Sequence, residues 1–141
     1  MNRYMIIIVA IFIFTIIVFA VFNNNGDRER ADIKSVNANE FNDLLSSGNN
    51  LVVVDFRTPE EFSEGSIASA INIDFNSFSF KSKLEKLEKE KEYLIYCRNG
   101  NRSGQALEIM KNMGFKNVTN LSGGILSWTN SGYSLNICRN C

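Results

Sequence analysis

Hydrophobic and polar positions divide the chain into an apolar N-terminal run and a longer part in which two kinds of segment alternate. The run from Met5 to Phe22 is apolar at every position except Thr15. After it, short apolar runs typical of buried strands alternate with segments whose apolar residues recur at helical spacing. This alternation predicts an α/β fold with a largely parallel sheet.

The boundaries of the expected elements follow from the apolar runs and from cap residues. The strands are expected over residues 33–36, 51–55, 70–73, 93–96 and 118–121. The helices are expected over residues 37–45, 81–91, 103–113 and 124–130, and a further helix begins after Thr58. Thr58 and Glu61 flank Pro59 at the spacing of a capping box, with proline in the first helical position. Asn37 and Glu40 have the same spacing at the start of the first helix.

The N-terminal run has a length at the lower edge of what spans a bilayer, and it lacks the polar face of a surface helix. We therefore interpret residues 1–22 as a membrane anchor or signal segment that contacts the membrane through residues 5–22. Residues 23–32 are polar and are expected to form a tether. An uncleaved anchor is favoured over a cleaved signal peptide because the run exceeds a usual signal core, although Val18-Phe19-Ala20 offers a small-residue cleavage site.

Two signals in the sequence bear on the orientation of this anchor, and they point in opposite directions. Arg28, Arg30 and Lys34 follow the run, whereas only Arg3 and the terminal amine precede it, and this count leans toward a cytoplasmic domain. A very short tail before a single first apolar segment is instead typical of an export signal. We expect the domain to lie outside the cytoplasmic membrane; a secreted form after cleavage and a cytoplasm-facing form are the alternatives.

Composition excludes several kinds of function. The chain has 15 basic and 15 acidic residues, and this balance argues against nucleic-acid binding. It contains no histidine, which excludes Ser–His and Cys–His catalytic pairs and histidine-ligated metal sites. A cysteine nucleophile in this chain must therefore be activated by other groups.

The segment from Tyr93 to Gly104 carries the clearest candidate chemistry. An apolar strand leads into a polar loop that opens with Cys97, and a helix begins near Ser103. Unsatisfied N–H groups at such a loop and helix start favour a thiolate, which is the nucleophilic form of cysteine. The same amides, with two arginines nearby, are suited to a small oxyanion.

Three blocks of sequence together resemble the rhodanese (sulfurtransferase) family. The first contains residues 53–62 (Val-Val-Asp-Phe-Arg-Thr-Pro-Glu-Glu-Phe) and Gly65-x-Ile67 with Ala70-Ile71-Asn72-Ile73, the second is Cys97-Arg98-x-Gly100-x-Arg102-Ser103, and the third is Gly114-Phe115-x-Asn117-Val118 with Leu121-x-Gly123-Gly124-Ile125-x-x-Trp128. The blocks occur in the order and spacing of that family and extend over roughly residues 33–130.

The resemblance implies one rhodanese-like domain over residues 33–132, with a central parallel five-stranded sheet flanked by helices. It implies that sulfane sulfur moves from a donor such as thiosulfate to an acceptor through a persulfide on Cys97. The acceptor would be a thiol, cyanide or a protein, and no cofactor or metal is required.

Site residues follow from the same loop. Cys97 is the expected catalytic residue. The expected substrate-binding residues are Arg98, Asn99, Gly100, Asn101, Arg102 and Ser103. Asp55 and Arg57 are expected to form an ion pair that braces the neighbouring loops, and Trp128 is expected to be a core residue.

The sequence departs from the family at three positions, and these departures bear on substrate preference and loop geometry. Ser66 replaces the usual histidine of Gly-His-Ile, Ser69 replaces a glycine, and Asp74 replaces a proline. A phosphatase or arsenate reductase of the same fold is the first alternative, but those enzymes carry a loop longer than the four residues between Cys97 and Arg102. A non-enzymatic module for redox sensing or partner docking is the second.

Residues 133–141 are expected to form a C-terminal tail that carries a CxxC motif, Cys138-Arg139-Asn140-Cys141. Two thiols without histidine make a poor zinc site within one chain. A terminal disulfide, a resolving pair for Cys97 and idle thiols are the interpretations left, and idle or simply oxidised thiols are favoured over a redox role.

Overall fold

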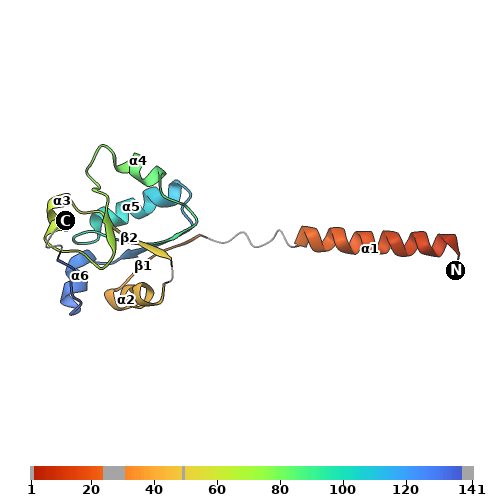
Figure 1. Ribbon diagram of the computed structural model, residues 1–141, viewed down its shortest axis with the longest axis horizontal. Helices are drawn as coiled ribbons and strands as arrows, with labels where there is room; N and C mark the ends of the chain where they lie inside the picture. The colour runs from red at the N-terminus through yellow and green to blue at the C-terminus, as the bar shows by residue number, and fades with distance from the viewer. Residues whose placement is uncertain (1, 24–30, 49, 138–141) are drawn as a thin grey trace. The chain divides into compact units, whose positions relative to one another are not determined.

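The computed structural model describes residues 2–23, 31–48 and 50–137 and contains two units, residues 1–30 and residues 31–141 (Figure 1). In the first unit, α1 (Arg3–Asn23) is one continuous helix whose described large apolar side chains are exposed. Within the described part of the chain, no helix meets the combined requirement of length and hydropathy for crossing a membrane. Cys138 and Cys141 lie outside the described residues, and so does most of the expected tether.

The second unit is an α/β domain built on one parallel sheet of five strands, as the sequence predicts. The strands are β1 (Asp32–Val36), β2 (Leu51–Asp55), β3 (Ala70–Asn72), β4 (Glu92–Tyr96) and β5 (Asn117–Leu121). Their order in the sheet is β1-β5-β4-β2-β3, so β4 lies at the centre. The helices are α2 (Ala38–Ser47), α3 (Pro59–Ser63), α4 (Phe80–Glu85), α5 (Asn101–Asn112) and α6 (Gly124–Asn130).

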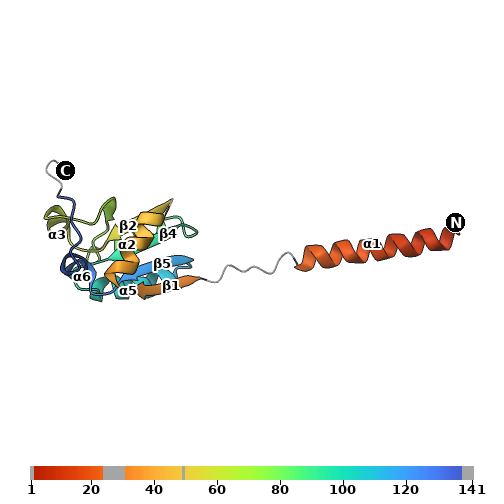
Figure 2. The same ribbon diagram turned by 90° about the horizontal axis from the view of Figure 1, so that it is seen from below.

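Side-chain alternation along β4 explains the layers of the domain. Tyr93 and Ile95 point into a core shared with α4 and α5, whereas Leu94 and Tyr96 point into a core shared with α2 and α6. Successive side chains of a strand face opposite sides of the sheet, and both sides are covered here. Accordingly, α2 and α5 lie on opposite faces of the sheet (Figure 2).

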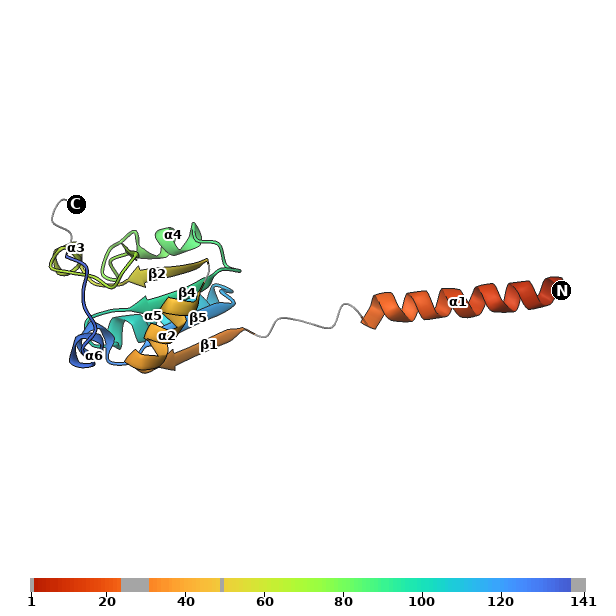
Figure 3. The same ribbon diagram turned by 60° about the horizontal axis from the view of Figure 1, so that its bottom comes forward.

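Local capping positions two helices as the sequence predicts. The Asn37 side chain accepts the N–H groups of Asn39 and Glu40 at the start of α2. At α3, Thr58 and Glu61 form the complete capping box. The first turn of α3 is thus fixed at the carboxyl edge of the sheet (Figure 3).

The helix expected over residues 81–91 ends early, at Glu85. Leu84 is fully buried, and Leu87 only packs at the edge of the core. The charged residues beyond them are used for tertiary contacts instead. The carbonyl of Lys89 accepts the N–H of Lys116, and the Lys89 ammonium donates to the carbonyl of Met113. The expectation of a helix to residue 91 is therefore wrong, because these contacts replace its last turns.

The segment after α6 packs on the domain over residues 133–137. Trp128 is buried, as expected, stacks on Tyr133, and donates its indole N–H to the carbonyl of Ser134. Ser66 and Asn136 exchange two backbone hydrogen bonds of 3.0 and 2.8 Å. This pairing holds residues 133–137 against the loop that precedes β3.

Candidate functional site

Cys97 is the first residue after the central strand β4, at the edge of the sheet where all five strands end (Figure 3). Open parallel sheets bind their ligands at this edge. The residue is fully buried, and its sulfur faces the loop that leads into α5. The strand therefore delivers the thiol to a site covered by the loop itself.

Two donors of the loop contact the sulfur. The N–H of Gly100 lies 3.2 Å from Cys97 Sγ, and the hydroxyl of Ser103 lies 3.5 Å from it. Gly100 caps α5 with a φ of 92°, a conformation that side-chain-bearing residues rarely adopt. A Cβ there would also stand 3.1 Å from the backbone nitrogen of Gly123. Glycine thus allows the loop to turn its N–H toward the sulfur.

The environment lowers the pKa of Cys97 below its ordinary value. Burial is the largest influence and raises the pKa, because it penalises the charged form. The Ser103 hydroxyl and the backbone N–H groups of Ser103, Asn99 and Gly100 together outweigh it. These hydrogen bonds therefore favour the thiolate despite its burial.

The start of α6 fixes the backbone of the loop of residues 97–100, which we call the cysteine loop. Ile125 N–H donates to the carbonyl of Cys97 at 2.8 Å, and Leu126 N–H donates to the carbonyl of Arg98 at 3.2 Å. Gly124 has a φ of 59°, and a Cβ at this position would stand 2.4 Å from the Cys97 oxygen. Gly124 of the last sequence block is thus a packing requirement of the site, a role that the sequence analysis did not assign.

Arg102 lies at the start of α5 and is paired with an acidic side chain of α3. Its guanidinium makes a two-point ion pair with Glu61, with N···O distances of 2.8 and 3.0 Å. The hydrogen bond from Arg102 holds the pKa of Glu61 at about 2. The Cys97 thiolate is also among the groups that raise the pKa of Arg102. Glu61 was expected only as a helix cap; it also joins α3 to the cysteine loop.

Asp55 and Arg57 form the expected ion pair at the end of β2. Arg57 Nη2 lies 2.7 Å from Asp55 Oδ2, and both side chains are almost fully buried. The same Nη2 donates to the carbonyl of Gly65, and the guanidinium lies 5.9 Å from the centre of the Tyr96 ring. Removing one partner of such a buried pair costs about 3–5 kcal/mol. The pair braces the loop before β3 against the sheet.

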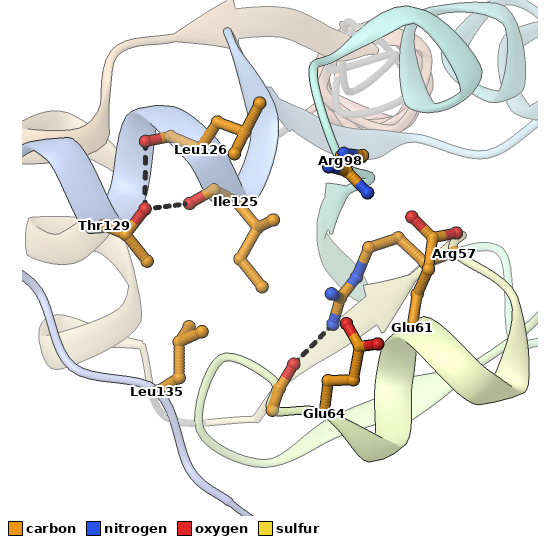
Figure 4. Close-up of a pocket in the computed structure, with 9 residues that line it drawn as sticks. Arg57, Glu61, Glu64, Arg98, Ile125, Leu126, Thr129 and Leu135 are labelled. Carbon is orange, nitrogen blue, oxygen red and sulfur yellow. Dashed lines mark hydrogen bonds between the residues drawn. The ribbon is translucent and has the colours of Figure 1, made fainter.

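A cavity of about 260 Å³ lies beside the cysteine loop (Figure 4). Its lining residues are Arg57, Glu61, Glu64, Gly65, Arg98, Ile125, Leu126, Thr129 and Leu135. Figure 4 shows charged side chains along one wall and Ile125, Leu126 and Leu135 along the other. Arg98 is exposed and belongs to this wall, directly after Cys97 in the chain.

The expected binding residues therefore divide into three groups. Gly100 and Ser103 contact the sulfur, and Arg98 lines the cavity. Asn99 and Asn101 are exposed, and the Asn99 side chain accepts the N–H of Asn101, which shapes the loop. Arg102 is paired with Glu61, and Arg98 and Arg57 are the arginines that line the cavity.

Among the residues that the structure describes, no cluster of three or more cysteine, aspartate or glutamate side chains is arranged to hold a metal ion.

An α/β domain with a cysteine in an amide-lined loop at the carboxyl edge of its sheet defines a class of thiol-dependent enzymes and their relatives. The family description "Rhodanese-like domain" matches residues 37–131. The chain belongs to the rhodanese-like domain family.

Individual relatives agree with this assignment. A putative sulfurtransferase, YtwF, of Bacillus subtilis is 33% identical over 97 residues, which cover 69% of this chain and 91% of the relative. A thiosulfate:glutathione sulfurtransferase of Saccharomyces cerevisiae is 27% identical, with coverage of 80% and 94%. The crystal structure of a rhodanese-related protein from Thermoplasma volcanium is 33% identical and superposes with a TM-score of 0.66, covering 74% of this chain and 99% of that one.

Proposed function

We propose that the protein is a sulfurtransferase that carries sulfane sulfur as a persulfide on Cys97. The observation that carries this proposal is the contact of Cys97 Sγ with the Gly100 N–H and the Ser103 hydroxyl, together with the lowered pKa of the thiol. These hydrogen bonds favour the thiolate that attacks the sulfur donor, and they equally favour the anionic persulfide that results. The names of the sulfurtransferase relatives support the same reaction class.

The reaction consists of two displacements at sulfur. The Cys97 thiolate attacks the outer sulfur of thiosulfate, a new S–S bond forms, and the S–S bond of thiosulfate breaks to release sulfite. An acceptor nucleophile, either a thiolate or cyanide, then attacks the outer sulfur of the persulfide. The Cys97–sulfur bond breaks and the thiolate is restored, without a net change in redox state. A thiolate of lowered pKa is also the better leaving group in this second step.

Two arginines are suited to the anionic donor. Arg98 and Arg57 both line the cavity next to the loop. The hydrogen bonds of Arg57 to described residues use its backbone N–H, Nε and Nη2, and none uses Nη1. We assign to these guanidinium groups the neutralisation of the donor's sulfonate, because guanidinium groups bind such oxyanions through charge-assisted hydrogen bonds.

The test is the substitution Cys97→Ser. Serine keeps the size of the side chain but is a far weaker nucleophile, so we expect the variant to lose thiosulfate:cyanide sulfur transfer and to unfold at nearly the same temperature as the wild type. Mass spectrometry after incubation with thiosulfate should show one added sulfur, 32 Da, on the wild type and none on the variant.

The alternatives give different results in the same experiment. Hydrolysis of an aryl phosphate without sulfur transfer would support a phosphatase. A folded wild type that neither gains sulfur nor turns over either substrate would support a non-enzymatic module. Either result would contradict the proposed function.

We also propose that α1 anchors the chain in a membrane and that the domain lies outside the cytoplasmic membrane. The support is the sequence of residues 5–22, which is apolar except at Thr15, and the exposure of the described apolar side chains of α1. Such side chains are stable when lipid covers them. Protease added to intact spheroplasts should digest the domain, whereas protection until lysis would contradict this orientation.

A further inference from the structure

The cysteine loop contains a dipeptide that can react without any substrate or enzyme. Asn99 is exposed to solvent and is followed directly by Gly100. In an asparagine–glycine pair, the glycine nitrogen can attack the side-chain carbonyl carbon of asparagine, and ammonia then leaves. Glycine favours this attack because it has no side chain in the way and adopts most backbone conformations. The loop therefore carries a second reactive group beside the thiol.

The structure keeps the two reacting atoms of this dipeptide close to each other. The side-chain oxygen of Asn99 accepts the backbone N–H of Asn101 at 3.2 Å. The ring closed by this hydrogen bond contains both Asn99 Cγ and the Gly100 nitrogen, so it holds them on the same side of the chain. A hydrogen-bond donor on the carbonyl oxygen also stabilises the negative charge that develops there during the attack.

The attacking nitrogen belongs to a donor that contacts the sulfur of Cys97. The Gly100 N–H lies 3.2 Å from Cys97 Sγ, nearer than the Ser103 hydroxyl at 3.5 Å. Formation of the cyclic imide removes this hydrogen, and the sulfur loses the donor. Opening of the imide by water adds a carboxylate to the loop, and its isoaspartate product also lengthens the loop backbone by one carbon. A negative charge and displaced donors both disfavour the thiolate.

We propose that Asn99-Gly100 is a self-modification site, and that its deamidation limits how long the Cys97 thiol stays reactive. Hydroxide removes the Gly100 N–H proton, and the nitrogen forms a bond to Asn99 Cγ. The bond from Cγ to the amide nitrogen breaks, and the departing group takes a proton from water and leaves as ammonia. Water then opens the imide to aspartate or isoaspartate, and nothing is oxidised or reduced. The modification itself does not require the proposed function, whereas its effect on sulfur transfer rests on it.

The experiment follows the modification and the thiol on the same molecule. The full-length protein in detergent is incubated at mildly alkaline pH until a free peptide of residues 98–104 is half converted under the same conditions. Samples are alkylated briefly with iodoacetamide and cleaved after lysine, which releases residues 92–111 as one peptide that contains both Cys97 and Asn99. Tandem mass spectrometry locates the gain of about 1 Da that deamidation produces and the alkyl group on the thiol. Uptake of sulfur from thiosulfate is measured separately.

We expect Asn99 of the folded protein to be deamidated within this time. Alkylation of Cys97 should be about tenfold slower in the deamidated peptide than in the unmodified one, as for the loss of one hydrogen bond to a charged group. Asn99→Gln is the matched variant, because glutamine closes a less favourable, larger ring. It should keep its own starting rate of alkylation throughout the incubation. Asn99→Asp adds the charge but keeps the Gly100 N–H, so its alkylation should be slowed less than that of the deamidated wild type.

Three results would overturn the inference. The first is an unmodified Asn99 in the folded protein when the free peptide is half converted. The second is equal alkylation of deamidated and unmodified peptides, because the thiol would then not depend on the Gly100 N–H. The third is an equal loss of reactivity in Asn99→Gln, which would assign the ageing to another group. Failure of the fresh protein to take up sulfur from thiosulfate would instead overturn the proposed function and leave the other two measurements valid.

Discussion

At the scale of single residues, the site depends on hydrogen bonds to one sulfur. Cys97 is buried, which by itself would favour the neutral thiol. Ser103 and the loop amides reverse this preference. The balance between burial and donors is therefore the property that decides the reactivity of the thiol.

Ser103→Ala tests this balance. Loss of the hydroxyl removes a donor to the thiolate, so we expect the pKa of Cys97 to rise and its alkylation by iodoacetamide at neutral pH to slow by roughly tenfold, the lower end for a hydrogen bond to a charged group. The measurement is the pH dependence of alkylation. Asn101→Ala, which alters a loop residue away from the sulfur, is the control. An unchanged midpoint in Ser103→Ala would show that the amides alone hold the thiolate.

The Glu61–Arg102 ion pair predicts a specific pH dependence of stability. The pKa of Glu61 is about 2 in the folded protein, below its usual 4.5, so the unfolded state binds this proton more readily. The stabilisation is fully present above about pH 4.5 and is lost as the pH falls toward 2. Glu61→Gln should therefore be less stable than the wild type at pH 7, and the difference should shrink in that acid range.

Chemical denaturation at pH 7, 4 and 2.5 measures this difference. Glutamine keeps an oxygen for the N–H of Thr58, so the helix cap is largely preserved. Glu108→Gln, in a loose exposed pair with Lys111 at 3.9 Å, should show almost no pH-dependent difference. A constant gap between Glu61→Gln and the wild type at all three pH values would contradict the assignment.

At the scale of elements, the start of α6 and the cysteine loop depend on a close backbone approach. Gly124 combines a positive φ with a backbone so close to Cys97 that an added Cβ would stand 2.4 Å from the Cys97 carbonyl oxygen. A side chain there must displace the cysteine loop, and the backbone N–H groups that face the Cys97 sulfur move with it.

Gly124→Ala should therefore lower both the unfolding temperature and the rate of sulfur transfer. Gly132→Ala provides a matched control, because Gly132 has a similar positive φ of 86° but nothing within 4 Å of an added Cβ. The control reports the backbone strain alone, about 1 kcal/mol. Thermal unfolding and thiosulfate:cyanide assays compare the two. Equal effects of both substitutions on activity would show that the contact with Cys97 has no role.

At the scale of the whole molecule, the chain separates into an apolar helix and a domain with its own two-sided core. A chain that begins at Ala31 keeps every core residue of the domain. We expect it to unfold at the same temperature as the full chain in detergent and to retain its sulfur transfer.

Fractionation completes this prediction. The full chain should sediment with membranes and resist extraction by alkaline carbonate, whereas the chain from Ala31 should be recovered in the supernatant. Recovery of both forms in the supernatant would contradict the proposed anchor. A domain that fails to fold without residues 1–30 would contradict the independence of its core.

Several features of the fold follow from local sequence. The capping box at Thr58 and the apolar run of β2 depend only on neighbouring residues, so their positions were predictable. The helix after Phe80 was predicted too long, because the end of the charged run is set by contacts of Lys89 with residues 113 and 116. Those partners lie far away in the sequence and leave no periodic signal.

The sequence by itself determined the parallel α/β architecture and singled out Cys97 as the candidate nucleophile, because hydrophobic period and loop composition are local properties. Only the tertiary structure decided what surrounds that nucleophile. The ion pair of Arg102 with Glu61, 41 positions earlier, has no signal in the local sequence. The cavity likewise exists only where the ends of β2 and β4, the start of α6 and residue Leu135 meet. Charge pairing and enclosure arise between segments distant in the chain, and folding is what brings them within range.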